Sequence, residues 1–136
     1  MFLNLLGKEE KELVLDLLFS AANIDGDFDE RERIVISAYG AEMGIAQENI
    51  KQSNKSIDDI LTQLSKSSEL VKKIVALEII ALIGVDGTYK ESEKKLLKNI
   101  TKKFSLKKAY EEKALNWVNR ITPLYKEGYE LVGLTK

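Results

Sequence analysis

Apolar residues recur along most of the chain with the spacing of an amphipathic α-helix. In the first clear segment, from Leu13 to Ala22, they fall at positions i, i+3 and i+4. No segment alternates between apolar and polar residues as a half-buried strand does. The same spacing predicts further helices over about 29–43, 46–53, 57–65, 69–84, 91–104 and 107–121. We therefore expect an all-α fold, a compact bundle of about seven helices forming a single domain over residues 1–136.

Local residues indicate where these helices begin and end. Asp-Gly pairs at 25–26 and 86–87 favour turns, because glycine adopts the left-handed backbone that stops a helix. Ser56 is typical of an N-cap, with Asp59 three residues later. Pro123 is expected to end or kink the last long helix.

The predicted helix 69–84 is apolar on nearly every side, which is typical of a helix at the centre of a bundle. Glu78 interrupts this apolar surface. A buried carboxylate must be paired, hydrogen-bonded or protonated. Two interpretations stay open: Glu78 reaches water or a lysine at the edge of the bundle, or it belongs to an internal polar site.

The chain contains an internal repeat, with copies at about 8–45 and 69–106. Residues 21–32 align with residues 82–93 at a constant offset of 61 positions. In each copy an apolar helix runs into an Asp-Gly turn, and a glutamate follows seven residues after the aspartate. The pattern predicts a duplicated helix-turn-helix unit arranged around the central helix.

The carboxylates of the two turns have a structural interpretation. Asp29 with Glu32 in the first copy, and Thr88 with Glu91 in the second, have the spacing of a capping box. A helical wheel places Glu32 and Glu93 on the apolar faces of their helices. We therefore expect both to point inward, toward their own Asp-Gly turn or toward the opposite copy.

A second interpretation is that the acidic turns bind a divalent cation, calcium or magnesium, which prefer oxygen ligands. The first turn resembles the start of an EF-hand loop, but Glu30 and Ile36 stand where that loop needs glycine and a bidentate glutamate. The candidate metal ligands are Asp25, Asp27, Asp29 and Glu32. The matching residues of the second copy are Asp86, Glu91 and Glu93. Capping alone and cation binding both stay open.

Composition narrows the possible chemistry. The chain has no histidine and no cysteine, which excludes disulfides, thiolate nucleophiles, imidazole catalysis and the usual zinc sites. A net charge of −1 conceals two unlike halves: residues 1–68 carry 7 basic and 13 acidic residues, whereas residues 69–136 carry 14 and 9. This contrast indicates an acidic and a basic surface with different roles.

At the two Asp-Gly-x5-Glu turns, Asp25 to Glu32 and Asp86 to Glu93, the chain resembles the TerB family of tellurite-resistance proteins over about residues 8–121. The resemblance implies a compact all-α domain with a duplicated core and a cytoplasmic, non-enzymatic role. It further implies association with stress-response systems and metal-associated or membrane-complex scaffolding. Gly84 and Lys90 depart from the family pattern.

A basic strip follows the second turn. On one side of the helix that begins near residue 91, opposite its apolar stripe, lie Lys90, Lys94, Lys95, Lys98 and Lys102. This strip is either a solvated face or a surface that docks to an acidic protein or an anionic membrane. No nucleic-acid motif accompanies it, so we do not expect a nucleic-acid partner.

The sequence as a whole favours a non-enzymatic, cytoplasmic binding or scaffold module with a protein partner, in solution or at a membrane. No transmembrane segment is expected, because no apolar stretch reaches about 20 residues. The alternatives are a hydrolase or lyase that uses inward-facing carboxylates and a module that docks its basic face to an anionic membrane or nucleic acid.

Overall fold

The computed structural model describes residues 1–22, 24, 30–46, 55–83 and 90–134. These ranges hold one short 3-10 helix and six α-helices and contain no strand, which confirms the all-α class. The helices are η1 (Leu3–Leu5), α1 (Lys8–Ala22), α2 (Glu30–Glu42), α3 (Ile57–Leu64), α4 (Glu69–Ile83), α5 (Glu91–Lys103) and α6 (Lys108–Leu131). The helix expected over 46–53 lies almost wholly outside the described residues, so six α-helices are seen where about seven were expected.

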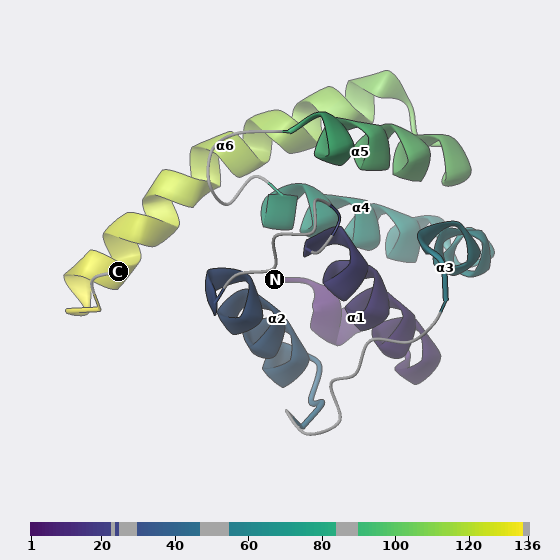
Figure 1. Cartoon of the computed structure of the whole chain (residues 1–136). Helices are drawn as coiled ribbons and strands as arrows, with labels where there is room; N and C mark the ends of the chain where they lie inside the picture. Colours follow the sequence, from purple (N-terminus) through teal and green to yellow (C-terminus); the bar gives the residue numbers. More distant parts are fainter. Residues whose placement is uncertain (23, 25–29, 47–54, 84–89, 135–136) are drawn as a thin grey trace.

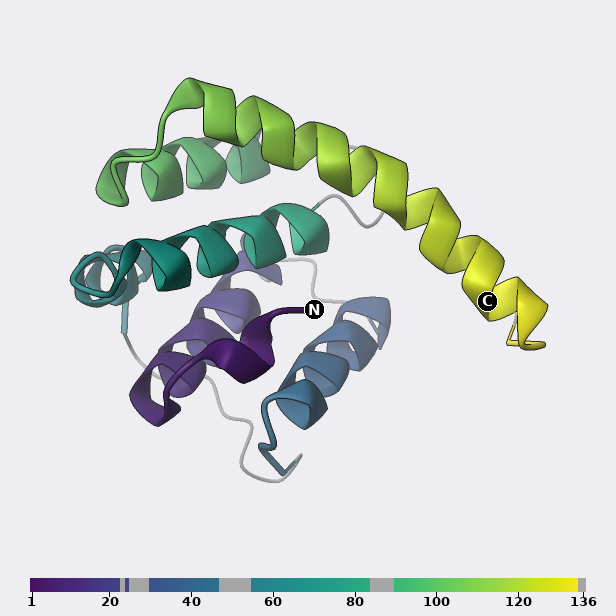
Figure 2. The ribbon, with the colours of Figure 1, turned by 180° about the vertical axis from the view of Figure 1, so that it is seen from behind.

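Helix α4 runs through the centre of the molecule. It contacts α1 and η1 on one side and α5 and α6 on the other (Figures 1 and 2). Val75, Ala76, Ile79 and Ile80 on α4 have no exposed surface. The position follows from composition, because a helix that is apolar on nearly every side is stable only when other helices cover it.

The two copies of the repeat correspond to two pairs of helices, α1 with α2 and α4 with α5. All four helices keep the offset of 61 positions at both of their ends. The ends of α2 and α5 also agree in detail. The backbone N–H of Ile45 donates to the carbonyl of Gly40, and 61 residues later Leu106 donates to Thr101. Each pattern closes a helix through one left-handed residue, Gly44 in the first copy and Ser105 in the second.

Helix starts match the sequence in one case and differ in another. The Ser56 hydroxyl accepts a hydrogen bond from the backbone N–H of Asp59 at 3.1 Å, which confirms the predicted N-cap of α3. Helix α5 begins at Glu91, so its N-cap is Lys90 and not Thr88, as the sequence had suggested. Glu93, the third residue of α5, accepts from the backbone N–H of Lys90 at 2.8 Å.

Helix α6 is longer than the sequence predicted. It continues through Pro123 to Leu131, so the expectation of a helix ending near residue 121 is wrong. Proline removes one backbone N–H, which leaves the carbonyl of Asn119 without its helical donor. Both Asn119 and Pro123 are exposed, so water can satisfy that carbonyl and the helix need not stop.

Candidate functional site

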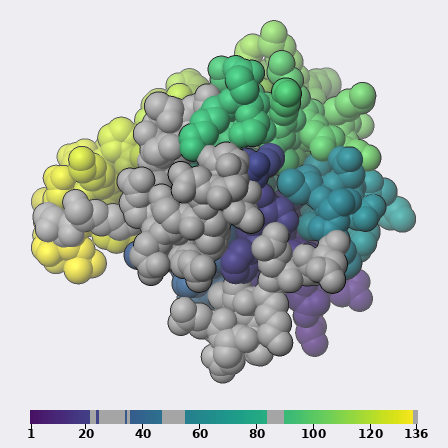
Figure 3. Space-filling view, in the orientation of Figure 1, coloured from purple at the N-terminus to yellow at the C-terminus, as the bar shows by residue number. Residues whose placement is uncertain are grey.

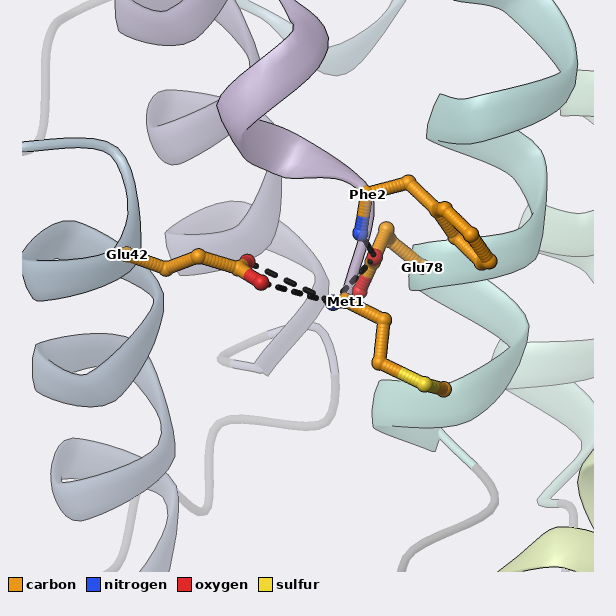
Figure 4. A network of polar contacts seen from close by, with 4 residues as sticks. All are labelled: Met1, Phe2, Glu42 and Glu78. Carbon is orange, nitrogen blue, oxygen red and sulfur yellow. Dashed lines mark hydrogen bonds and ion pairs between the residues drawn. The ribbon is translucent and has the colours of Figure 1, made fainter.

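Glu78, at the centre of α4, is buried with 3% of its surface exposed. Its Oε1 atom accepts two hydrogen bonds from the start of the chain. The Met1 ammonium lies 2.7 Å away and the backbone N–H of Phe2 lies 2.8 Å away (Figure 4). These contacts hold the first residues of the chain against the central helix.

A second carboxylate, that of Glu42, lies near the same ammonium. We call Met1, Glu42 and Glu78 together the cluster. Glu42, the last residue of α2, lies 3.1 Å from the Met1 ammonium through its Oε1 atom (Figure 4). One ammonium group therefore joins the end of α2 to the interior of α4, two helices that are far apart in sequence. The Phe2 ring lies 6.5 Å from the ring of Trp117 on α6, so the same short segment also contacts a third helix.

Two titratable groups respond to this cluster. Burial by itself lowers the pKa of the Met1 ammonium, but the hydrogen bonds and negative charges of Glu78 and Glu42 outweigh it and raise that pKa above its ordinary value. Burial, followed by the charges of Glu78 and Glu42, raises the pKa of the Tyr39 hydroxyl. Both shifts favour the protonated forms of these groups.

The cluster decides between the two interpretations of Glu78. The interpretation as an edge residue that reaches water or a lysine is wrong, because Glu78 is buried and its positively charged partner is the Met1 ammonium. Sequence reasoning missed this partner because no residue type marks an α-amino group. The signal that was available is the buried Glu78 itself, which requires a donor from somewhere in the fold.

We expect the protein to lose stability as the pH rises above about 8, the ordinary pKa of the α-amino group. The pKa of the Met1 ammonium is higher in the folded chain than its unfolded value of about 8. Its stabilising contribution is therefore complete below pH ~8 and is lost as the pH rises through the folded pKa. Urea unfolding at a series of pH values measures this loss, below the range near pH ~10 in which tyrosine ordinarily titrates.

An Nα-acetylated chain is the control for this measurement, because it carries no ammonium to titrate. Its stability should be lower at pH ~7 and nearly constant across the same range. An equal decline in the acetylated and unmodified chains would contradict the assignment.

Most of the predicted metal ligands cannot be placed. Asp25, Asp27, Asp29 and Asp86 lie outside the described residues, and Glu32 lies in α2 with its side chain outside the described part. Among the side chains that are described, no three acidic groups gather closely enough to hold a metal ion. The cation site therefore stays a prediction.

The described members of the second copy do not converge on a common site. Glu93 caps its own helix by accepting a hydrogen bond from the backbone N–H of Lys90. Glu91 is exposed and lies 3.5 Å from the ammonium of Lys94. A helix-terminal role explains both, since acidic groups are favourable near the N-terminus of a helix.

The basic strip is placed as the sequence predicted it. All five of its lysines are exposed on α5 and at the residue before it. They are Lys90, Lys94, Lys95, Lys98 and Lys102. The apolar residues of the same helix, Leu96, Leu97 and Ile100, are buried, so the basic and apolar faces are separate.

The structure also contains a cleft that sequence reasoning missed. It has a volume of about 820 Å³, and its lining includes Glu9, Glu12 and Asp16 from α1, Ile45, and Lys55. The three acidic residues fall on one face of α1, which the sequence could have indicated. The cleft itself depends on the placement of Ile45 and Lys55 beside that helix.

The C-terminal part of α6 extends beyond the rest of the bundle (Figures 1 and 2) and forms one margin of the molecular surface (Figure 3). Apolar side chains remain exposed there: Leu124 at 61%, Leu131 at 86% and Val132 at 71%. By contrast, Ala114 and Val118 in the first half of α6 are buried. Two tyrosines of the same region, Tyr125 and Tyr129, are also exposed.

Comparisons with known proteins leave the family open. No protein-family model, curated protein or solved structure matches the chain. Within the described part of the chain, no helix is both long enough and apolar enough to cross a membrane.

Proposed function

We propose that this protein is a non-enzymatic binding or scaffold module of the TerB-like type, acting in a cytoplasmic stress-response system. The observation that carries the proposal is the exposed apolar surface at the end of α6, formed by Leu124, Leu131 and Val132. We call this segment, from Ile121 to Leu134, the α6 arm. Contiguous apolar patches on a protein surface mark sites where another molecule binds.

The geometry of the arm supports this role. Helix α6 is held to the bundle through its first half, where Ala114 and Val118 are buried and the Tyr110 hydroxyl donates to the carbonyl of Lys73 on α4 at 2.9 Å. The arm itself spans about three helical turns, and isolated helices this short are marginal in water. A partner that covers its apolar side would stabilise it as a helix.

Two of the carboxylates, those of Glu78 and Glu93, make contacts that support a structural role for them. Glu78 holds the start of the chain, and Glu93 caps α5. Neither carboxylate is left to serve as an acid or base without disrupting those contacts. Glu78 and Glu93 therefore lend no support to the hydrolase or lyase alternative, and the side chain of Glu32 lies outside the described part of the chain.

Partner binding through the arm can be tested with two exposed substitutions, Leu124→Glu and Leu131→Glu, made together. The tagged chain captures proteins from an extract of its source cells, and mass spectrometry quantifies them. We expect the amount of a captured protein to fall at least ~10-fold with this variant, because two apolar anchors are removed. The control is Lys94→Glu with Lys98→Glu on the basic strip.

The outcome separates the candidate surfaces. The proposed function is supported if the captured protein is lost with the arm variant and retained with the control. Loss with the basic-strip variant alone would instead assign partner binding to α5. Circular dichroism shows whether each variant keeps its helices.

We further propose that the first acidic turn, with Asp25, Asp27, Asp29 and Glu32 as ligands, binds calcium or magnesium. Calorimetric titration of the metal-free protein should give saturable heat that disappears in Asp25→Asn with Asp27→Asn, because both changes remove charged oxygen ligands. The matched control, Asp58→Asn with Asp59→Asn on α3, should titrate like the unmodified chain. Absence of saturable heat in the unmodified chain would leave helix capping as the role of the turn.

A further inference from the structure

The exposed side of α6 has a seven-residue repeat. Trp117, Leu124 and Leu131 recur at every seventh position, with Ile121 and Gly128 between them. Residues at these spacings form one straight seam along a helix, and such a seam is typical of a helix that packs against a second helix. Leu124 and Leu131 are largely exposed, and Trp117 is partly exposed at the end of the seam nearest the bundle.

Two opposite charges lie along one edge of this seam. Arg120 and Glu127 are both exposed and are seven residues apart, so they lie on the same side of α6. When two identical helices pair antiparallel about a two-fold axis, each edge runs beside the same edge of the other copy. An axis midway between these residues places Arg120 of each chain beside Glu127 of the other, which gives two ion pairs.

Gly128 fits the same arrangement. A Cβ atom added at Gly128 would meet nothing within 4 Å, so packing within one chain does not require glycine there. Glycine inside a helix is less stable than alanine. In the antiparallel pair, Gly128 of one copy comes near the level of Trp117 of the other, where the missing side chain leaves room for the indole ring.

We propose that the α6 arm and the turn of α6 just before it bind a second copy of this chain as an antiparallel helix pair. The pair is held by the seam from Trp117 to Leu131 and by two Arg120–Glu127 ion pairs. This inference rests on the proposed function, because it names the partner of the same surface. Two short helices bury a contact below the usual ~1,200 Å² of stable interfaces. The dimer is therefore weak and depends on protein concentration.

Sedimentation equilibrium of the purified full chain, between about 10 µM and about 1 mM, spans the affinities expected of so small an interface. The mass should rise from 15.4 kDa toward twice that value. Leu124→Glu should keep the chain monomeric throughout. Since Leu124 is 61% exposed, this change should not disturb folding.

Charge exchange tests the antiparallel register. Arg120→Glu alone should weaken association by about 3- to 10-fold, because it replaces two attractive pairs with two repulsive ones. Adding Glu127→Arg should restore association to within about twofold, because the pairs re-form with reversed sign. Lys126→Glu, on the opposite side of the arm, is the matched control and should leave association unchanged.

The results distinguish this inference from the proposed function. A chain that stays monomeric at the highest concentration overturns self-association, and so does a double charge exchange that fails to restore it. If that monomeric chain still loses a captured protein through Leu124→Glu with Leu131→Glu, the binding role of the arm stands with a different partner. If neither mass nor capture changes, both proposals fall.

Discussion

Replacing Phe104 with alanine is expected to lower the free energy of unfolding by about 3–5 kcal/mol. Phe104 follows α5 directly and has no exposed surface, and it is among the largest of the fully buried side chains. The change removes a buried ring and leaves a cavity that its close-packed neighbours fill only in part. Urea unfolding followed by circular dichroism measures the difference.

The control for this variant is Leu70→Ala on α4. Leu70 is 61% exposed, so its truncation removes little buried surface and should change stability by less than about 0.5 kcal/mol. A loss below about 1 kcal/mol for Phe104→Ala would show that the space around this ring collapses freely, contrary to the packing described here.

Replacing Glu78 with alanine is expected to lower the free energy of unfolding by about 2–4 kcal/mol, because it breaks a buried ion pair and leaves two donors without their acceptor. In this variant the Met1 ammonium is partly exposed and still has Glu42 as a partner at 3.1 Å. The loss of stability is therefore expected near the lower end of this range. Urea unfolding at neutral pH provides the measurement.

Glu42→Ala is the matched control, since the Glu42 pair is partly exposed and should contribute at most about 1 kcal/mol. Nα-acetylation supplies the other half of the test. Acetylation of the unmodified chain leaves Glu78 buried without its cation and should be destabilising, whereas in Glu78→Leu it should have a much smaller effect. Equal effects of acetylation in both backgrounds would show that the two groups do not interact.

The cluster and the arm have different consequences for the fold. The Met1–Glu78 contact joins residues 77 positions apart and draws η1 against α4, so it closes the centre of the bundle. The α6 arm, by contrast, extends beyond the bundle and exposes apolar side chains. Stability is therefore concentrated around α4, and partner binding is proposed for the part of the chain that contributes least to the core.

Local patterns in the sequence determined much of this architecture. The spacing of apolar residues predicted the described α-helices, most of them to within a few residues at each end, but not the short 3-10 helix η1. The Asp-Gly turns predicted the repeat, and α1–α2 and α4–α5 keep its offset of 61 positions at every helix end. The uniform apolarity of residues 69–84 predicted the central helix, and Ser56 predicted the start of α3. Each of these features depends on residues close together in sequence.

Only the tertiary structure decided the features that depend on distant groups. The sequence indicated that a buried Glu78 needs a partner. That partner is a terminal ammonium, which no side-chain pattern reveals. Glu93 lies on the apolar face of a helical wheel, yet the position of the helix start turns its carboxylate to the backbone of Lys90. Proline removes one backbone donor from a helix, but Pro123 and Asn119 are exposed here and α6 continues to Leu131. Local propensities determine where helices form. The tertiary arrangement of the helices determines which group pairs with a buried charge and which end of a helix stays exposed.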